Sequence, residues 1–252
     1  MSTETKTTPI ALPDPTETYS QDREWCVIRL NGSWEEVQFH DYGRIYQVPG
    51  LYERLFYDIL RCASPATVRR LLHERLEGAG ADPATLRVID LGAGNGIMGE
   101  ELRSIGAGSV VGIDIIPEAA EAAERDRPEV YDAYHVVDMT DPDGDTEAAL
   151  LGLRPNGLTC VAALGFADIP PEAFRRAYNM LEPGSWVAFN IKEDFLTNTD
   201  SSGFSGLIAR AIAEGDLDVL ARERYPHRLS TSGVPLYYIA LVGQKRRDLA
   251  AL

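Results

Sequence analysis

Between residues 86 and 191, short apolar runs alternate with segments whose spacing of apolar residues is helical. The strand-like runs are 86–91, 109–114, 133–138, 158–164 and 185–191. The helix-like segments between them begin near Asn95, Pro117, Thr146 and Pro170. Strands that are apolar along most of their length are typical of a parallel sheet covered on both faces. The alternation therefore predicts an α/β fold in which helices sandwich a parallel sheet.

The two flanks of this region have different patterns. Residues 1–20 are rich in Thr, Pro and Glu and predict a disordered tail. Residues 21–85 predict an N-terminal lobe, with a hairpin over 25–39 around an Asn-Gly turn and two helices after it. We expect the core domain to cover 86–252. After a helix from 204 to 215, it should end in two antiparallel strands joined near Ser232-Gly233.

The sharpest motif is VIDLGAGNG, which runs from Val88 to Gly96 at the exit of the first strand of the alternation. Glycines at 92, 94 and 96 allow a tight turn and let a ligand lie against the backbone. A second acidic residue, Asp114, closes the next strand, 114 − 96 = 18 residues after the last glycine of the motif. A carboxylate at about 20 residues from such a loop is typical of one that binds a ribose diol.

Two kinds of cofactor are compatible with this loop. The register Gly94, Gly96 and Gly99 spells the GxGxxG of nicotinamide-dependent oxidoreductases. However, Asp90 would then lie beneath a pyrophosphate, where two like charges repel. The chain also lacks a Tyr-x-x-x-Lys pair after the fourth strand. S-adenosylmethionine has no phosphate, and its cationic groups suit an acidic residue near the turn.

An acidic residue followed by GxGxG resembles the first motif of the class I S-adenosylmethionine-dependent methyltransferases. The resemblance, which covers roughly 86–244, implies a Rossmann-like sheet and methyl transfer to a small-molecule acceptor, such as a natural product or a peptide. It implies that Asp114 binds the ribose, that Ile115 packs on adenine, and that Asp138 and the Met139 backbone meet the adenine amino group. The expected cofactor-binding residues also include Asp90, Gly92, Ala93, Gly94, Asn95, Gly96 and Ala163. Two departures are Ser185 in the LxPGG-like turn and a fourth strand without the acidic residue that many relatives carry.

Acceptor chemistry should take place at the carboxyl ends of the strands. Similar enzymes cover the methionine end of the cofactor with a tyrosine, so we expect residues 39–52 to form a lid that contributes Tyr42 and Tyr46. His227, Asp168 and His40 lie in rim segments and are the candidate catalytic bases. For each of these side chains the alternative is a structural role. A second alternative for the whole chain, besides an oxidoreductase, is an interaction protein that keeps the fold without catalysis.

Charge and composition limit the partners. The formal net charge of −15 opposes binding to nucleic acid, and the one dense basic stretch, Lys245–Arg247, has the pattern of a solvated end. Three separated cysteines predict neither disulfides nor a metal site, which favours a reducing compartment. With no signal-peptide pattern and no apolar run of about 20 residues, we expect a cytoplasmic protein without membrane spans. The methyl acceptor and the oligomeric state stay open.

Overall fold

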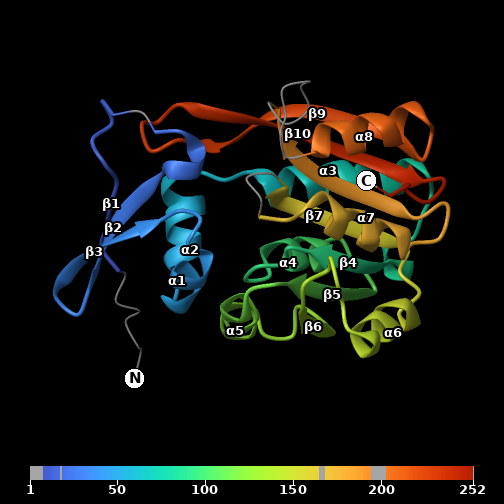
Figure 1. The fold of residues 1–252 in the computed structure, drawn as a ribbon, viewed down its shortest axis with the longest axis horizontal. Coiled ribbons are helices and arrows are strands. Elements are labelled where there is room, and N and C mark those ends of the chain that lie inside the picture. Colours follow the sequence, from blue (N-terminus) through green and yellow to red (C-terminus); the bar gives the residue numbers. More distant parts are fainter. Residues whose placement is uncertain (1–7, 18, 165–167, 194–202, 252) are drawn as a thin grey trace. The chain divides into compact units, whose positions relative to one another are not determined.

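The computed structural model describes residues 8–17, 19–164, 168–193 and 203–251. The chain divides into two compact units, shown in Figure 1. Unit 1 comprises residues up to 63 together with 226–236, and unit 2 comprises 64–225 and 237–252. This division differs from the predicted boundary after residue 85. The helix at 64–78 belongs to the core unit, and part of the late strand pair belongs to the N-terminal unit.

Among the described residues of unit 2, seven strands form one sheet in the order β6-β5-β4-β7-β8-β10-β9. Their bounds are β4 Arg87–Leu91, β5 Ser109–Asp114, β6 Ala133–Val136, β7 Gly157–Leu164, β8 Trp186–Lys192, β9 Leu217–Leu229 and β10 Pro235–Lys245. Strands β4 to β8 pair in parallel, whereas β10 pairs with β8 in the antiparallel direction. The predicted α/β class with a C-terminal antiparallel pair is therefore confirmed.

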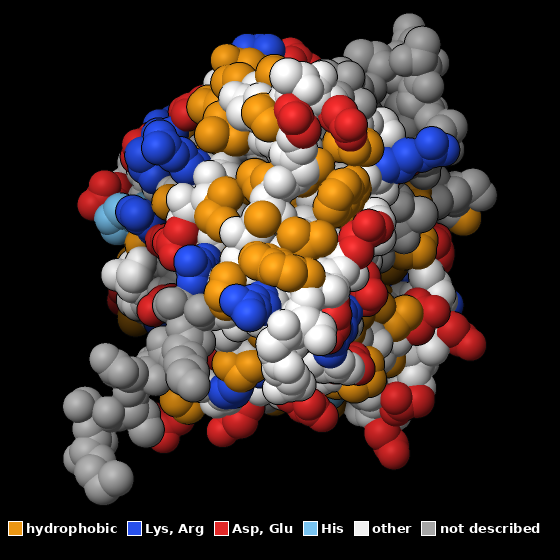
Figure 2. Space-filling model, turned by 90° about the vertical axis from the view of Figure 1, so that its left-hand side faces the viewer, with side chains coloured by type: hydrophobic (Ala, Val, Ile, Leu, Met, Phe, Trp, Pro, Cys, Tyr) orange, Lys and Arg blue, Asp and Glu red, His pale blue; other side chains and the backbone are white. Residues whose placement is uncertain are grey.

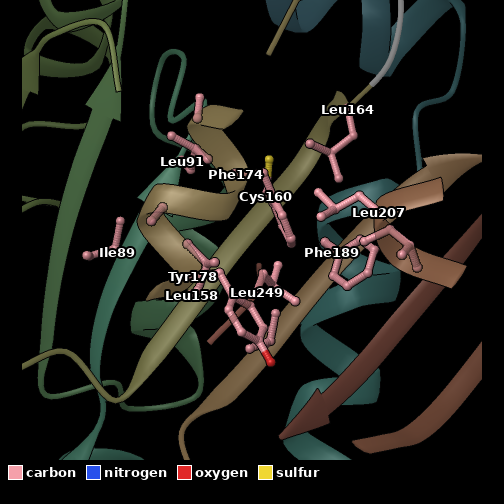
Figure 3. Close-up of a cluster of buried hydrophobic side chains, with 14 of the residues drawn as sticks. Ile89, Leu91, Leu158, Cys160, Leu164, Phe174, Tyr178, Phe189, Leu207 and Leu249 are labelled. Carbon is pink, nitrogen blue, oxygen red and sulfur yellow. The ribbon is translucent and has the colours of Figure 1, made fainter. Parts of the chain in front are cut away.

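Helices of unit 2 bury both faces of this sheet. They are α3 Ser64–Gly78, α4 Ile97–Ser104, α5 Pro117–Asp126, α6 Gly144–Gly152, α7 Pro171–Asn179 and α8 Phe204–Ala213, with a short 3-10 turn η3 at Pro83–Thr85. One buried cluster, part of which Figure 3 shows, joins the sheet to α6, α7 and α8 and includes Ile89 and Phe189. The other cluster joins it to α3 and α4 and includes Val88. Neighbouring residues of β4 thus point to opposite faces, which explains why the strand is apolar throughout.

The strand order places a topological switch point between β4 and β7. From β4 the chain continues to β5 and β6 on one side, and then returns to β7 and β8 on the other. In open α/β sheets, ligands bind outside the carboxyl ends of the strands at this point. The loops that leave β4, β5 and β7 are therefore where a site is expected.

Unit 1 is built around a small antiparallel sheet of β1 Ile10–Ala11, β2 Trp25–Leu30 and β3 Ser33–Gln38. Its helices are α1 Tyr42–Gln47, α2 Leu51–Glu53, the π-helix η2 Arg54–Ile59 and the 3-10 turn η1 Gln21–Arg23. The predicted hairpin is confirmed. Asn31 and Gly32 both have positive φ, 49° and 89°, as a two-residue type I′ turn requires.

The prediction of a disordered tail over residues 1–20 is wrong at Ile10 and Ala11. These residues pair with Ile28 and Val27 of β2, and Ile10 packs against the core of unit 1. Composition missed this strand because its partner lies many residues away along the chain.

Figure 2 looks at the side of the molecule on which these strands are drawn, where hydrophobic side chains gather among charged ones.

In the basic stretch Lys245–Arg247, Arg246 and Arg247 are exposed as predicted, but Lys245 is not. Lys245 is buried and donates hydrogen bonds to the carbonyl groups of Tyr178 and Leu181, at 3.1 and 2.6 Å. These carbonyls lie at the end of α7, where a cation is favoured by the helix dipole. In the described part of the chain, no helix is both long and apolar enough to cross a membrane.

Candidate functional site

The glycine loop connects β4 to α4 in unit 2. Gly92, Gly94 and Gly96 all have positive φ, at 73°, 53° and 89°. Residues with a Cβ adopt this backbone conformation only with strain, which is why the motif needs glycine at alternate positions. At Gly92 space is a second reason, because an added Cβ would lie 2.8 Å from both the Ala163 Cβ and the Ile169 Cδ1.

The backbone amides of this loop donate to oxygen atoms of the chain itself. Those of Gly92 and Ala93 donate to the Ile113 carbonyl, at 2.8 and 3.0 Å. The amide of Gly94 donates to the Asp114 Oδ2 at 2.9 Å. In dinucleotide-binding loops, amides of this kind hold the pyrophosphate. Because these three are already engaged, the loop favours a ligand without phosphate.

Asp90, at the end of β4, faces the interior. Its side chain is 1% exposed, and its two oxygens accept hydrogen bonds from the hydroxyls of Thr159 and Tyr131, both at 2.7 Å. Burial raises the pKa of Asp90 to about 6, although the two hydroxyls act in the opposite direction. Ionised Asp90 is therefore a negative charge held directly beneath the glycine loop.

Two tyrosines support the loop, and sequence reasoning missed both. The Tyr134 hydroxyl donates to the Gly94 carbonyl at 2.8 Å, and Tyr131 holds Asp90 from the same region. Their rings meet edge-on at 5.4 Å. An added Cβ at Gly99 would lie 2.7 Å from the Tyr131 ring, and one at Gly112 would lie 2.9 Å from the Tyr134 ring. An isolated glycine inside a helix or a strand was thus the available signal for a close approach.

Asp114 and Ile115 lie at the carboxyl end of β5. Besides the bond from Gly94, Asp114 accepts one from the Ile116 amide at 3.0 Å. Burial raises the pKa of Asp114, the backbone bonds lower it, and the negative charge of Asp168 raises it further. Ile115 leaves 57% of its surface exposed. The pair offers a carboxylate next to an uncovered apolar surface.

Asp138, Met139 and Ala163 are further predicted cofactor-binding residues. Asp138 is exposed, and its Oδ1 accepts from the amide and the hydroxyl of Thr140, at 2.8 and 2.7 Å. These bonds lower the pKa of Asp138. The Met139 side chain is buried in the core. Ala163 lies against the glycine loop at Gly92.

Asp168 is the one candidate base that unit 2 carries. It is half-buried, and its charge acts on the carboxyl group of Asp114. The next residue, Ile169, forms an isolated bridge with Leu164 and packs on Gly92. Parts of the predicted rim, residues 165–167 and 194–202, lie outside the described residues.

The other candidate base favoured by the sequence, His227, belongs to unit 1. Its side chain is 5% exposed, and its Nδ1 lies 3.8 Å from the Cys62 Sγ. Burial first, and the charge of Arg228 second, lower the pKa of His227 well below its usual value. A buried, neutral imidazole is typical of a histidine with a structural role.

His40 and the predicted lid also belong to unit 1. His40 meets the Tyr42 ring edge-on at 5.7 Å, and Tyr42 stacks on Tyr46 at 6.3 Å. Most of the segment 39–52 is helix α1 and the turn into α2, with Ile45 and Leu51 fully buried in the core of this unit. The segment is therefore packed structure within unit 1.

Comparison with known proteins matches residues 62–211 to the methyltransferase domain family. A curated relative, the ribosomal protein L11 methyltransferase of Burkholderia mallei, is 36% identical over 88 residues. That match covers 33% of this chain and 28% of the relative, so the chain spans less than a third of the length of the curated relatives it matches.

Solved structures share the fold. The N-methyltransferase NodS from Bradyrhizobium japonicum, in complex with S-adenosyl-L-homocysteine, aligns with a TM-score of 0.55 and 14% identity, over 82% of this chain and 97% of that one. Magnesium protoporphyrin IX methyltransferase from Synechocystis, with bound S-adenosylmethionine, aligns with a TM-score of 0.53 and 15% identity, over 82% and 90%. With the family match over more than half of its length, the chain belongs to the methyltransferase domain family, among the class I S-adenosylmethionine-dependent methyltransferases.

Proposed function

We propose that this protein transfers the methyl group of S-adenosylmethionine to a small-molecule acceptor, at the carboxyl ends of β4, β5 and β7. The observation that carries the proposal is the arrangement around the glycine loop. Its amides are engaged by the chain, while Asp114 and the exposed Ile115 stand beside it. This arrangement suits an adenosyl group without phosphates.

The residues present fit this cofactor. A carboxylate has about four acceptor positions, so Asp114 can accept from ribose hydroxyls while it keeps its two backbone bonds. Ile115 offers an apolar face to adenine. Asp138, together with the Met139 backbone, is proposed to meet the adenine amino group. The glycines let the ligand approach the backbone closely, and Asp90 places a negative charge near its cationic end.

The bound cofactor supplies a methyl group activated by a sulfonium. The task of the chain is then to hold the acceptor in line with that group and to exclude water, and orientation of this kind contributes about 7–11 kcal/mol. A base is needed only where the acceptor must lose a proton. We propose Asp168 for that role, because its charge already acts on Asp114. The catalytic roles of His227 and His40 and the cofactor contacts of Tyr42 and Tyr46 stay predictions, since these residues belong to unit 1.

The net charge of the chain supports a small-molecule acceptor. A net charge of −15 repels polyanions, so a small molecule or a peptide is favoured over nucleic acid. The partial likeness to a ribosomal protein L11 methyltransferase makes a protein acceptor the second candidate.

Calorimetric titration tests the cofactor. S-adenosylhomocysteine should bind and raise the melting temperature, because it stabilises the native state by mass action, whereas NADH should do neither. Asp114→Ala should lose most of the affinity. Tight binding of NADH with none of S-adenosylhomocysteine would overturn the proposal. Labelled S-adenosylmethionine offered with a metabolite extract, a peptide library or total RNA then identifies the acceptor class.

A further inference from the structure

Strands β7 and β8 fall out of register near their carboxyl ends. Cys160 pairs with Phe189 and Leu164 pairs with Ile191, so residues 161–163 of β7 stand opposite the single residue Asn190 of β8. Such a bulge interrupts the ladder of backbone hydrogen bonds and re-aims the side chains of the longer strand. The bulge residues 161–163 are half-buried, so backbone groups that lose their strand partner need other partners there.

The bulge is strained at Ala162. This residue has a φ of 57°, in the left-handed region that residues other than glycine seldom adopt. A strained conformation persists only where the surrounding structure holds it, and such positions cluster at ligand sites.

Asn190 provides the missing partner. Its side chain is fully buried, and its Oδ1 accepts a hydrogen bond from the Ala162 amide at 2.6 Å. Its Nδ2 donates to the Tyr225 hydroxyl at 2.7 Å and to the Ser64 Oγ at 3.0 Å. These two hydroxyls are themselves 2.7 Å apart. Tyr225 of β9 and Ser64 of α3 thus fix the orientation of the Asn190 side-chain amide. Its carbonyl oxygen takes the place of a backbone carbonyl of a neighbouring strand, which would otherwise accept the hydrogen bond from the Ala162 amide.

The residue after the strained one contacts the cofactor loop. The Ala163 methyl lies so close to Gly92 that an added Cβ there would approach it to 2.8 Å. A shift of the bulge would therefore move Ala163, which contacts the glycine loop on the side that faces β7. Because β7 borders the switch point, this side of the loop is part of the expected ligand crevice.

We propose that Asn190 is a positioning residue for the cofactor site: its side-chain carbonyl replaces the strand partner lost at the β7 bulge and so holds Ala163 against the glycine loop. The proposal rests on the proposed function only in taking the ligand of that loop to be an adenosyl group. Tyr225 and Ser64 act one step further away, by orienting the amide.

A double-mutant cycle on S-adenosylhomocysteine affinity tests this role, measured by calorimetry on variants shown to be folded by circular dichroism. Asn190→Leu keeps the approximate volume and removes the acceptor, and affinity should fall about tenfold or more. Ala162→Gly relieves the strain, since glycine accepts positive φ without cost. In that background, the loss caused by Asn190→Leu should be clearly smaller. A purely structural residue would lower stability in both backgrounds and leave the affinity of the folded protein unchanged.

Two further variants serve as controls. Tyr225→Phe removes one of the two hydroxyls that orient Asn190 but leaves the bond to Ala162, so affinity should fall by less than in Asn190→Leu. Asn190→Asp keeps an acceptor for Ala162, and both hydroxyls can donate to it, so affinity should largely recover even if stability falls. This variant also serves as the test if Asn190→Leu does not fold.

Hydrogen exchange separates this proposal from the proposed function. The amides of residues 162–164 should exchange faster in Asn190→Leu than in the wild type and stay protected in Tyr225→Phe, with or without ligand. If the wild type does not bind S-adenosylhomocysteine, the proposed function fails while this measurement still reports on the bulge. Unchanged exchange in Asn190→Leu, or an unchanged affinity in both backgrounds, would overturn the role of Asn190.

Discussion

The glycine loop of unit 2 and the buried ion pair of unit 1 are built from residues at very different separations along the chain. In the loop, Gly94 donates to Asp114 over 20 residues. In unit 1, Arg228 donates to Glu24 over 204 residues at 2.6 Å, and Glu24 also accepts from the Thr231 amide at 2.6 Å. Both partners of this ion pair are almost fully buried.

This difference in sequence separation predicts different consequences of mutation in the two regions. The loop takes its shape from glycine conformations and from the ends of two paired strands, so its residues can be changed with local consequences. Unit 1 is closed by a contact between its N-terminal segment and the β9–β10 turn, so a change there affects the whole unit. We therefore expect mutations in unit 1 to act mainly on stability, and mutations in the loop to act on ligand binding.

Removal of the buried ion pair should have the largest effect. Glu24→Ala leaves the Arg228 charge buried without its partner and should lower the free energy of unfolding by about 3–5 kcal/mol. Glu35→Ala is the matched control, because the side chains of Arg44 and Glu35 are 36% and 43% exposed, and the change should cost under about 1 kcal/mol. Urea unfolding followed by tryptophan fluorescence measures both, with Trp25 and Trp34 reporting on unit 1. Similar losses in the two variants would break the contrast between the units.

Ionisation of Asp90, next to the glycine loop, should make the stability of the protein depend on pH. Its pKa is raised to about 6 in the folded protein, above that of an unfolded aspartate, so the stability it contributes is present below about pH 4 and is lost as the pH rises through 6. Asp90→Asn removes this ionisation. The stability of the variant relative to the wild type should therefore increase by up to about 3 kcal/mol between pH 4 and pH 7.

Asp138→Asn is the control of opposite sign. Hydrogen bonds from Thr140 lower the pKa of Asp138, so its contribution is present at neutral pH and is lost as the pH falls. Denaturant unfolding from about pH 2 to pH 7 distinguishes the two variants, because the contribution of Asp138 is lost only below about pH 4. A difference between Asp90→Asn and the wild type that keeps changing steeply above pH 7 would mean that Asp90 stays protonated at neutral pH, which would remove the charge proposed beneath the loop.

The two candidate bases sharpen the contrast in catalysis. Asp168→Asn should lower turnover by about 100-fold or more while S-adenosylhomocysteine affinity is kept, as expected for a general base. His227→Asn should change turnover far less, because a buried neutral histidine of unit 1 acts on structure. Steady-state kinetics on an identified acceptor would measure both. A large loss in His227→Asn at unchanged stability would assign the base to unit 1 instead.

Gly92→Ala should have a local effect. Its positive φ strains any residue with a Cβ, and the new methyl would also meet Ala163 and Ile169. Gly106→Ala carries a similar strain, with a φ of 87°, but has open space around the added Cβ. Gly92→Ala should therefore cost about 1–3 kcal/mol more than Gly106→Ala, from overpacking, and it should also weaken S-adenosylhomocysteine binding. Equal effects on both measures would mean that the loop can shift freely at Gly92.

Sequence patterns were sufficient where the physics is local. The turn at Asn31-Gly32, the glycine loop and the strands β4 to β8 follow from backbone conformations and apolar periodicity within short windows. The placement of Asp114 beside the loop was accessible for the same reason, since parallel neighbouring strands end at the same edge.

Other features depended on contacts that no short window contains. Strand β1 needs a partner on β2, and Lys245 is buried because it reaches the carbonyls at the end of α7. Tyr134 is a support of the loop only because Gly112 of β5 makes room for its ring. From composition alone, strand β1 was assigned to a disordered tail and Lys245 to a solvated end.

The sequence by itself determined the class of fold and the kind of cofactor loop, because a glycine-rich turn after a buried strand has few conformations open to it. Only the tertiary structure decided which buried polar groups become partners. Asn190 and Ala162 come from different strands, and Glu24 and Arg228 come from opposite ends of the chain. Pairs of this kind are selected by the requirement that buried polar groups find partners, and the partner is known only once distant segments have packed together.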